Sequence, residues 1–133
     1  LDVAKEPVPI KFPPTPEIAD AFARALAIAS KLPEVEESRS YGTPAIRVKG
    51  KLIARLRSED EGGLTIRCEF LERDMLMQAE PETFYVTPHY QDYEMVLINL
   101  LRVRWDTMPD IMEKAWRMVA PKRLAKQFDD AAS

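Results

Sequence analysis

The sequence is short of several residue types that common classes of protein need. It has one cysteine and one histidine, so neither an internal disulfide nor a metal site built on a pair of histidines can form within the chain. No apolar run approaches the roughly 20 residues of a transmembrane helix. There is no G-x-S-x-G motif and no phosphate-binding loop. We therefore expect a non-enzymatic protein that has no cofactor, no metal and no membrane partner.

What remains is the composition of an ordinary globular domain. Of the 133 residues, 46% are hydrophobic and 31% are charged, which suits one domain with a core of its own. Five of the eleven prolines fall within residues 1–16, so we expect a proline-rich arm there, followed by a single domain over residues 17–128. A lone cysteine fits a reducing compartment, and we expect a cytoplasmic location.

Positive charge is concentrated in one stretch. Residues 38–57 contain six basic side chains and no acidic one, and the net charge of −3 divides into −3 for residues 1–37, +6 for residues 38–57 and −6 for residues 58–133. A local excess of one sign is what binding to a polyanion requires. The acidic pI near 5.3 argues against binding over the whole surface, so any such binding is expected to be local.

Two helices are predicted by their apolar periodicity and end signals. Thr15 is a good N-cap for a helix that begins with Pro16 and stops at Leu32-Pro33. A second helix is expected to begin near 107–110 and to end before Pro121, with a further turn or two over 122–128. Its inward residues are expected to be Ile111, Met112, Ala115, Trp116 and Val119. A shorter helix is expected over 71–80.

Alternation of apolar and polar residues predicts a three-stranded antiparallel meander over residues 46–70. Gly50 is expected in the first turn, and a polar loop over 58–63 makes the second connection. The side chains expected to face the core are Ile46, Val48, Leu52, Ala54, Leu56, Leu64, Ile66, Cys68 and Phe70. Ile53 and the basic residues would face the other way. Further strands are expected over 84–87 and, as a central strand, over 94–101.

Several ordered blocks resemble the MmcQ/YjbR-like family. They are Leu32-Pro33-Glu34-Val35-Glu36-Glu37, Tyr41-Gly42-Thr43-Pro44-Ala45, Val48-Lys49-Gly50-Lys51-Leu52-Ile53-Ala54-Arg55-Leu56, Glu72-Arg73, Phe84-Tyr85-Val86-Thr87-Pro88-His89-Tyr90, Ala115-Trp116-Arg117 and Ala120-Pro121-Lys122-Arg123. The resemblance covers residues 17–125. It implies an α+β fold of two layers, with helices packed on one face of an antiparallel sheet, and, through a double-wing comparison, DNA binding.

The leading candidate site is the sheet face that would point away from the helices. Alternation places six basic side chains on it. They are Arg47, Lys49, Lys51, Arg55, Arg57 and Arg67. Such a face could bind DNA weakly and without sequence preference by neutralising phosphates. It could also be a charged face that keeps the sheet soluble, and the acids Glu59, Asp60 and Glu61 in the nearby loop oppose the approach of a phosphate backbone.

The alternative is a cleft for a small ligand or a protein partner. It would be lined by Tyr41, Thr43, His89 and Tyr90, where two proline-containing corners are expected to meet. Gly42 and Pro44 also have a plain structural role in starting a strand. His89 is more typical of a residue that caps backbone groups than of a catalytic base, and Cys68 is most simply a small core residue. The sequence leaves the oligomeric state open.

Overall fold

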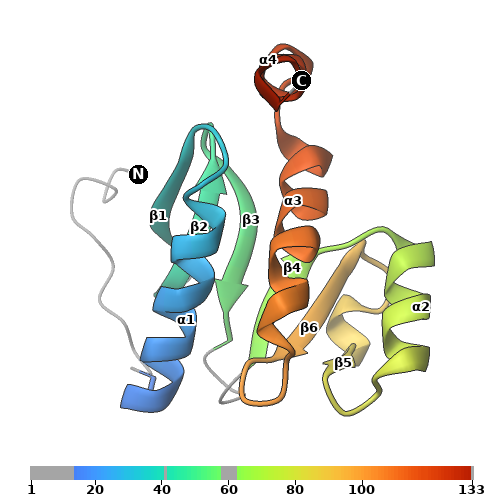
Figure 1. Ribbon diagram of the computed structural model, residues 1–133. Helices are drawn as coiled ribbons and strands as arrows, with labels where there is room; N and C mark the ends of the chain where they lie inside the picture. The colour runs from blue at the N-terminus through green and yellow to red at the C-terminus, as the bar shows by residue number, and fades with distance from the viewer. Residues whose placement is uncertain (1–13, 41, 58–62, 133) are drawn as a thin grey trace, which may run out of the picture.

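The computed structural model describes residues 14–40, 42–57 and 63–132, and these form a six-stranded antiparallel sheet with four α-helices (Figure 1). The strand order is β1-β2-β3-β4-β6-β5, and α1 and α3 lie side by side across one face of the sheet. The fold is therefore the two-layer α+β arrangement that the sequence predicts. The proline-rich arm, Tyr41 and the acidic loop lie outside the described residues.

The helices and strands follow one another along the chain in a simple order. They are α1 (Pro16–Ala29), β1 (Val35–Ser40), β2 (Thr43–Val48), β3 (Lys51–Leu56), β4 (Gly63–Arg67), α2 (Phe70–Ala79), β5 (Phe84–Tyr85), the 3-10 turn η2 (Pro88–Tyr90), β6 (Met95–Asn99), the 3-10 turn η3 (Trp105–Thr107), α3 (Met108–Val119) and α4 (Lys122–Ala132).

The two long helices begin and pack as predicted. The Thr15 hydroxyl accepts a hydrogen bond from the Ile18 amide at 3.3 Å, and Pro16 occupies the first helical position of α1. On α3 the expected inward residues are all buried, and Trp116 is fully buried with its indole N–H donating to the Pro33 carbonyl at 3.0 Å. This bond ties α3 to the segment between α1 and β1. The buried faces of α1 and α3 enclose the core together with β3 and β4.

A bulge in β3 overturns part of the predicted alternation. Ile46 pairs with Ala54 but Arg47 pairs with Leu52, so Ile53 is an extra residue on its strand. The register before the bulge is thereby shifted by one, because two residues of β3 oppose one of β2. Ile53, expected to face outward, is fully buried in the core, and Leu52, expected in the core, is only half-buried. Both of those predictions were wrong.

The boundary between β4 and α2 also differs from the prediction. Cys68 faces the core as expected, with 5% of its surface exposed. Phe70 is the first residue of α2 rather than the last inward residue of a strand, and 42% of it is exposed. The Phe70 amide donates to the Glu94 carboxylate at 3.2 Å, which satisfies one of the helix's free N-terminal N–H groups. Alternation could not register this cap, because Glu94 lies 24 residues away.

Strand β1 is absent from the sequence prediction. It pairs with β2 from Val35–Val48 to Ser40–Thr43 and forms one edge of the sheet. Its sequence, VEESRS, has almost no apolar alternation, because an edge strand buries little of itself and can carry charge. At the other end of the sheet, β6 lies between β4 and β5, as predicted for a central strand.

Candidate nucleic-acid interface

The two faces of the sheet have different surroundings, which can be followed along rows of paired residues that cross the strands. One row, Ile46, Ala54, Ile66 and Val96, crosses β2, β3, β4 and β6 and lies in the core beneath the helices. The next row, Ala45, Arg55, Thr65, Leu97 and Tyr85, crosses the same strands and β5. Because directly paired residues share a face and neighbours alternate, the second row lies on the face opposite the helices, which we call the outer face.

Four of the predicted basic residues share this outer face, by register and alternation. Arg47 lies on β2, Arg55 on β3, Arg57 directly after β3 and Arg67 at the end of β4. We call these four the basic face. All four side chains are half-buried, which leaves part of each accessible. The basic face therefore spans three neighbouring strands, and its charge does not come from one flexible loop.

Hydrogen bonds to neutral oxygen atoms orient Arg47 and Arg67. The Arg47 guanidinium donates to the Ser38 hydroxyl at 3.1 Å and to the carbonyls of Gly50 at 3.2 Å and Arg39 at 3.4 Å. Arg67 donates to the Leu52 carbonyl at 2.6 Å. Such bonds fix the planar head group without cancelling its charge, because carbonyl and hydroxyl oxygens carry no formal charge.

Arg55 and Arg57 join the outer face to η2. Arg55 donates to the Thr43 hydroxyl at 3.3 Å and to the Tyr90 hydroxyl at 2.9 Å. Arg57 donates to the Thr87 hydroxyl at 3.4 Å, and its guanidinium carbon lies 6.0 Å from the centre of the Tyr90 ring. The Thr43 hydroxyl in turn donates to the Ser40 carbonyl at 2.8 Å. Residues of the two sites predicted separately are therefore linked through Arg55.

A cavity of about 360 Å³ lies at this junction. It is lined by Arg55, Arg57, Thr87, Pro88, His89 and Tyr90, and we call it the arginine–tyrosine pocket. His89 is exposed, and its ring meets the Tyr90 ring edge-on with centroids 4.7 Å apart. Two guanidinium groups beside hydroxyl groups are a suitable donor set for phosphate or carboxylate. Thr43 is buried rather than part of this lining.

The remaining basic residues of the prediction lie at the edge of this surface. Lys49 and Gly50 occupy the turn between β2 and β3 with φ of 50° and 81°, as in the two-residue turns that suit a hairpin. Lys49 lies 3.9 Å from the Glu34 carboxylate. Lys51 pairs with core-facing Val48, so the bulge turns it away from the basic face. Tyr41, predicted for the alternative cleft, lies outside the described residues.

The middle of the outer face is buried. Ala45, Thr65 and Leu97 have no exposed surface there, although they belong to the row opposite the helices. A large ligand could therefore contact the head groups and η2, but not the strands below. This geometry suits contacts to a phosphate backbone, and the described part of the outer face consists of strands and η2, without a helix that could enter a DNA groove.

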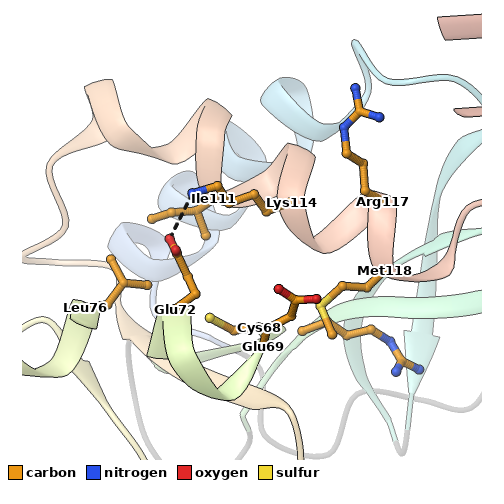
Figure 2. A pocket seen from close by; sticks show the side chains of 9 residues that line it. Cys68, Glu69, Glu72, Leu76, Ile111, Lys114, Arg117 and Met118 are labelled. Atoms are coloured by element: carbon orange, nitrogen blue, oxygen red, sulfur yellow. Dashed lines mark hydrogen bonds and ion pairs between the residues drawn. The ribbon is translucent and has the colours of Figure 1, made fainter. Parts of the chain in front are cut away.

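A second cavity, of about 420 Å³, lies on the helical side between α2 and α3 (Figure 2). We call it the α2–α3 cavity, and its lining is Arg67, Cys68, Glu69, Glu72, Leu76, Ile111, Lys114, Arg117 and Met118. Burial, and next to it the negative charge of Glu72, raise the pKa of the Cys68 thiol to about 12. Hydrogen bonds that the Lys114 ammonium donates to the Asp110 and Glu72 carboxylates raise the pKa of Lys114. The thiolate fraction at neutral pH is therefore very small, and Cys68 is a slow nucleophile.

Sequence reasoning missed Arg73, whose side chain makes four hydrogen bonds to the backbone. It is 8% exposed, and its guanidinium donates to four backbone carbonyls at 2.9–3.4 Å. The acceptors are the carbonyls of Tyr90, Gln91, Tyr93 and Met95. Its Nε has no partner within the described chain. Arg73 holds the segment between η2 and β6 against α2, so it positions Tyr90 beside Arg55.

The described residues contain no helix long and apolar enough to cross a membrane. Across residues 14–40, 42–57 and 63–132, no group of three or more histidine, cysteine, aspartate or glutamate side chains is placed to hold a metal ion.

A comparison with known protein families agrees with the fold and with the sequence blocks. The model of the YjbR family matches residues 30–118, which includes all six strands, the whole of α2 and all of α3 except its last residue, Val119. The chain belongs to the YjbR family. Its MmcQ/YjbR-like resemblance is thereby confirmed, and the match covers the basic face, η2 and both cavities.

The similar proteins and a similar solved structure support the fold and assign no activity. Uncharacterized proteins of Mycobacterium bovis and Mycobacterium tuberculosis are 34% identical over 53 residues, which is 40% of this chain and 41% of theirs. The match therefore spans less than half the length of these relatives. A crystal structure of a Deinococcus radiodurans protein with a DUF419 domain superposes with a TM-score of 0.61 at 17% identity, covering 72% of this chain and 75% of that one. The two-layer architecture is shared.

Proposed function

We propose that this YjbR domain is a non-enzymatic module that binds DNA weakly and without sequence preference through the basic face. One observation supports the proposal above the others: four arginines from three adjacent strands share the face opposite the helices, and neutral oxygens orient the head groups of Arg47 and Arg67. Guanidinium groups fixed in this way are suited to phosphate oxygens. In this proposal the protein works in the cytoplasm, where a lone thiol stays reduced.

Weak affinity and tolerance of sequence follow from the same geometry. The net charge of the chain is −3, so the protein as a whole repels a polyanion and only the local field attracts it. The head groups lie above a closed sheet and would meet the phosphate backbone, which is the same for every sequence. Each phosphate neutralised adds roughly 0.9 to the slope of log K against log salt.

The test is the salt dependence of binding to a fluorescent duplex, measured by anisotropy. The double variant Arg55→Ala/Arg57→Ala should lower the slope by about two. The matched control is Arg102→Ala/Arg104→Ala, which removes the same charge from residues paired with Glu82 and Glu80; its slope should stay close to that of the wild type. An absence of binding at low salt, or equal slopes for both double variants, would contradict the proposal.

Arg55 and Arg57 also hold Thr43, Thr87 and Tyr90, so the alanine variants change structure as well as charge. The variant Arg55→Lys/Arg57→Lys separates the two effects. It keeps both positive charges but loses the guanidinium geometry. If charge drives binding, the lysine variant retains the wild-type slope. If the slope falls as far as in the alanine variant, the arginines act by shaping η2, and the electrostatic proposal fails.

A second candidate function rests on the arginine–tyrosine pocket. Its 360 Å³ falls within the roughly 300–1,000 Å³ of small-molecule sites, and it brings Arg55 together with the predicted cleft residues His89 and Tyr90. It would bind a small phosphate- or carboxylate-bearing ligand. Titration of inorganic phosphate and of a mononucleotide, followed by amide chemical shifts, distinguishes the two functions. Saturation by the mononucleotide at lower concentration than by a duplex of equal phosphate content favours the pocket over the DNA surface.

A further inference from the structure

We propose that the α2–α3 cavity is a binding site for a small organic cation, an ammonium group carried on an apolar body. The cavity lies on the helical side of the sheet, and its apolar walls come from α2 and α3. The inference does not rest on nucleic-acid binding, although Arg67 of the basic face also belongs to this lining.

The size and walls of the cavity suit a compact apolar body. Its volume of about 420 Å³ is typical of a small-molecule site. Leu76 and Met118 contribute partly buried aliphatic surface, and Ile111 and Cys68 are buried at 5% exposure each. Transfer of an alkyl chain from water onto these walls is favoured by roughly 25 cal/mol for each Å² of apolar surface removed from water.

The charge of the cavity selects the sign of the ligand. Both α3 cations of the lining are already matched, each by two carboxylates. Lys114 lies 3.2 Å from Glu72 and 3.1 Å from Asp110. Arg117 lies 3.0 Å from Glu113 and 2.6 Å from Asp129. With Lys114 and Arg117 matched in this way, Glu69 is the carboxylate of the lining that makes no ion pair within the described residues, so a cation is favoured beside Glu69.

Glu69 is the group that would meet the ammonium. Within the described residues its carboxylate makes no hydrogen bond and no ion pair, and its side chain caps nothing at the start of α2. In Figure 2 it lies between Cys68 and Met118 in the middle of the lining, whereas the Arg117 guanidinium points away from both. Arg67 is drawn towards β3 by its bond to the Leu52 carbonyl. An ammonium beside Glu69 would therefore place its alkyl chain among Leu76, Ile111 and Met118.

Cys68 provides a reporter for this site. It is the single cysteine of the chain, and it lines the cavity with its thiol almost wholly covered. A bound molecule would cover the thiol further. If only the empty cavity reacts, a ligand at twice its dissociation constant slows labelling about threefold.

The experiment compares three probes of one size: hexylammonium, hexanol and hexanoate. The rate at which 4,4′-dithiodipyridine labels Cys68 in the whole chain is measured against the concentration of each probe at one mildly alkaline pH. Hexylammonium should protect the thiol at the lowest concentration, hexanol at a higher one, and hexanoate least. Equal or better protection by hexanoate would overturn the proposed charge preference, and no protection by any probe would overturn the site.

Two variants test the role of Glu69. Glu69→Gln keeps the volume and removes the charge, so the dissociation constant of hexylammonium should rise about two- to fivefold, as for an exposed ion pair, while that of hexanol stays unchanged. Asp74→Asn is the matched control, because Asp74 is an exposed acid of α2 outside the lining. If both variants weaken hexylammonium equally, the effect is one of net charge and the assignment of Glu69 fails.

Discussion

The cations of the helical layer and those of the outer face are held in different ways. On α3 and α4, Lys114, Arg117 and Lys126 each lie within 3.3 Å of one or more carboxylates. On the outer face, the hydrogen bonds that orient Arg47 and Arg67 end on hydroxyl and carbonyl oxygens. The first arrangement cancels charge locally and the second preserves it. Function is therefore better sought where the fold orients positive charge without neutralising it.

The helical layer contains Trp116, the largest of the fully buried side chains in the described residues, and Trp116→Ala is expected to give the largest effect. The ring has no exposed surface, packs at 5.2 Å from the centre of the Phe128 ring and donates to Pro33. The cavity left by its removal should lower the free energy of unfolding by about 3–5 kcal/mol, measured by urea denaturation. A loss below about 1 kcal/mol would show that Trp116 is not a core anchor.

A smaller loss of stability is expected when Arg73 is replaced. Arg73 lies on α2, and its hydrogen bonds end on neutral carbonyl oxygens, like those of Arg47 and Arg67 on the outer face. Arg73→Ala removes four hydrogen bonds to the segment that carries η2. We expect a loss of about 2–4 kcal/mol in chemical denaturation, because the carbonyls lose a partly buried donor. Arg73→Lys should not restore it, since an ammonium cannot reproduce the planar fork. Full recovery in the lysine variant would mean that charge alone holds this segment.

The pH dependence of stability distinguishes the buried thiol from the surface charges. Because the pKa of Cys68 is raised to about 12 in the folded state from 9.0, the native protein keeps a proton that the unfolded chain releases. The protonated thiol therefore contributes fully to the stability of the fold below pH 9, and this contribution is lost as the pH rises towards 12. Between pH 9 and 12 the free energy of unfolding should fall more steeply in the wild type than in Cys68→Ala. The difference in slope should be up to about 1.4 kcal/mol per pH unit. Parallel curves of denaturation midpoint against pH would contradict this.

The smallest effect is expected at an exposed ion pair. Lys126 lies 2.9 Å from Asp130 one turn along α4, and both side chains are mostly exposed. Lys126→Ala should change the free energy of unfolding by less than about 0.5 kcal/mol, since solvent screens such pairs. A loss above about 1 kcal/mol would mean that the exposed ion pairs of the helical layer stabilise the fold more than solvent screening allows.

The sequence predicted those parts of the fold that depend on local pattern. The spacing of Ile111, Ala115 and Trp116 and the cap at Thr15 are readable from neighbours in the chain, and the structure confirms them. The bulge at Ile53 was not readable, because its cause lies in the pairing with β2 and not in the strand itself. A polar edge strand such as β1 likewise carries too little apolar alternation to be detected.

The candidate site was predicted in two separate halves for a similar reason. Alternation grouped Arg55 and Arg57, and the proline corner singled out His89 and Tyr90, but no local pattern connects residues 35 positions apart such as Arg55 and Tyr90. Arg73 appeared in the sequence only as part of a family block. Its role depends on carbonyls of a segment 17–22 residues away. Only the fold could join these pieces.

Amide chemical-shift mapping of the protein with a short DNA duplex at low salt tests the central claim most directly. If the basic face binds the backbone, the largest shifts should fall on β2, β3, β4 and residues 87–90, and they should vanish together as salt is raised. The paired charges of α3 and α4 should give small shifts or none. Shifts centred on α3 and α4, or no shifts at low salt, would contradict the claim that charge held by neutral oxygens marks the functional surface.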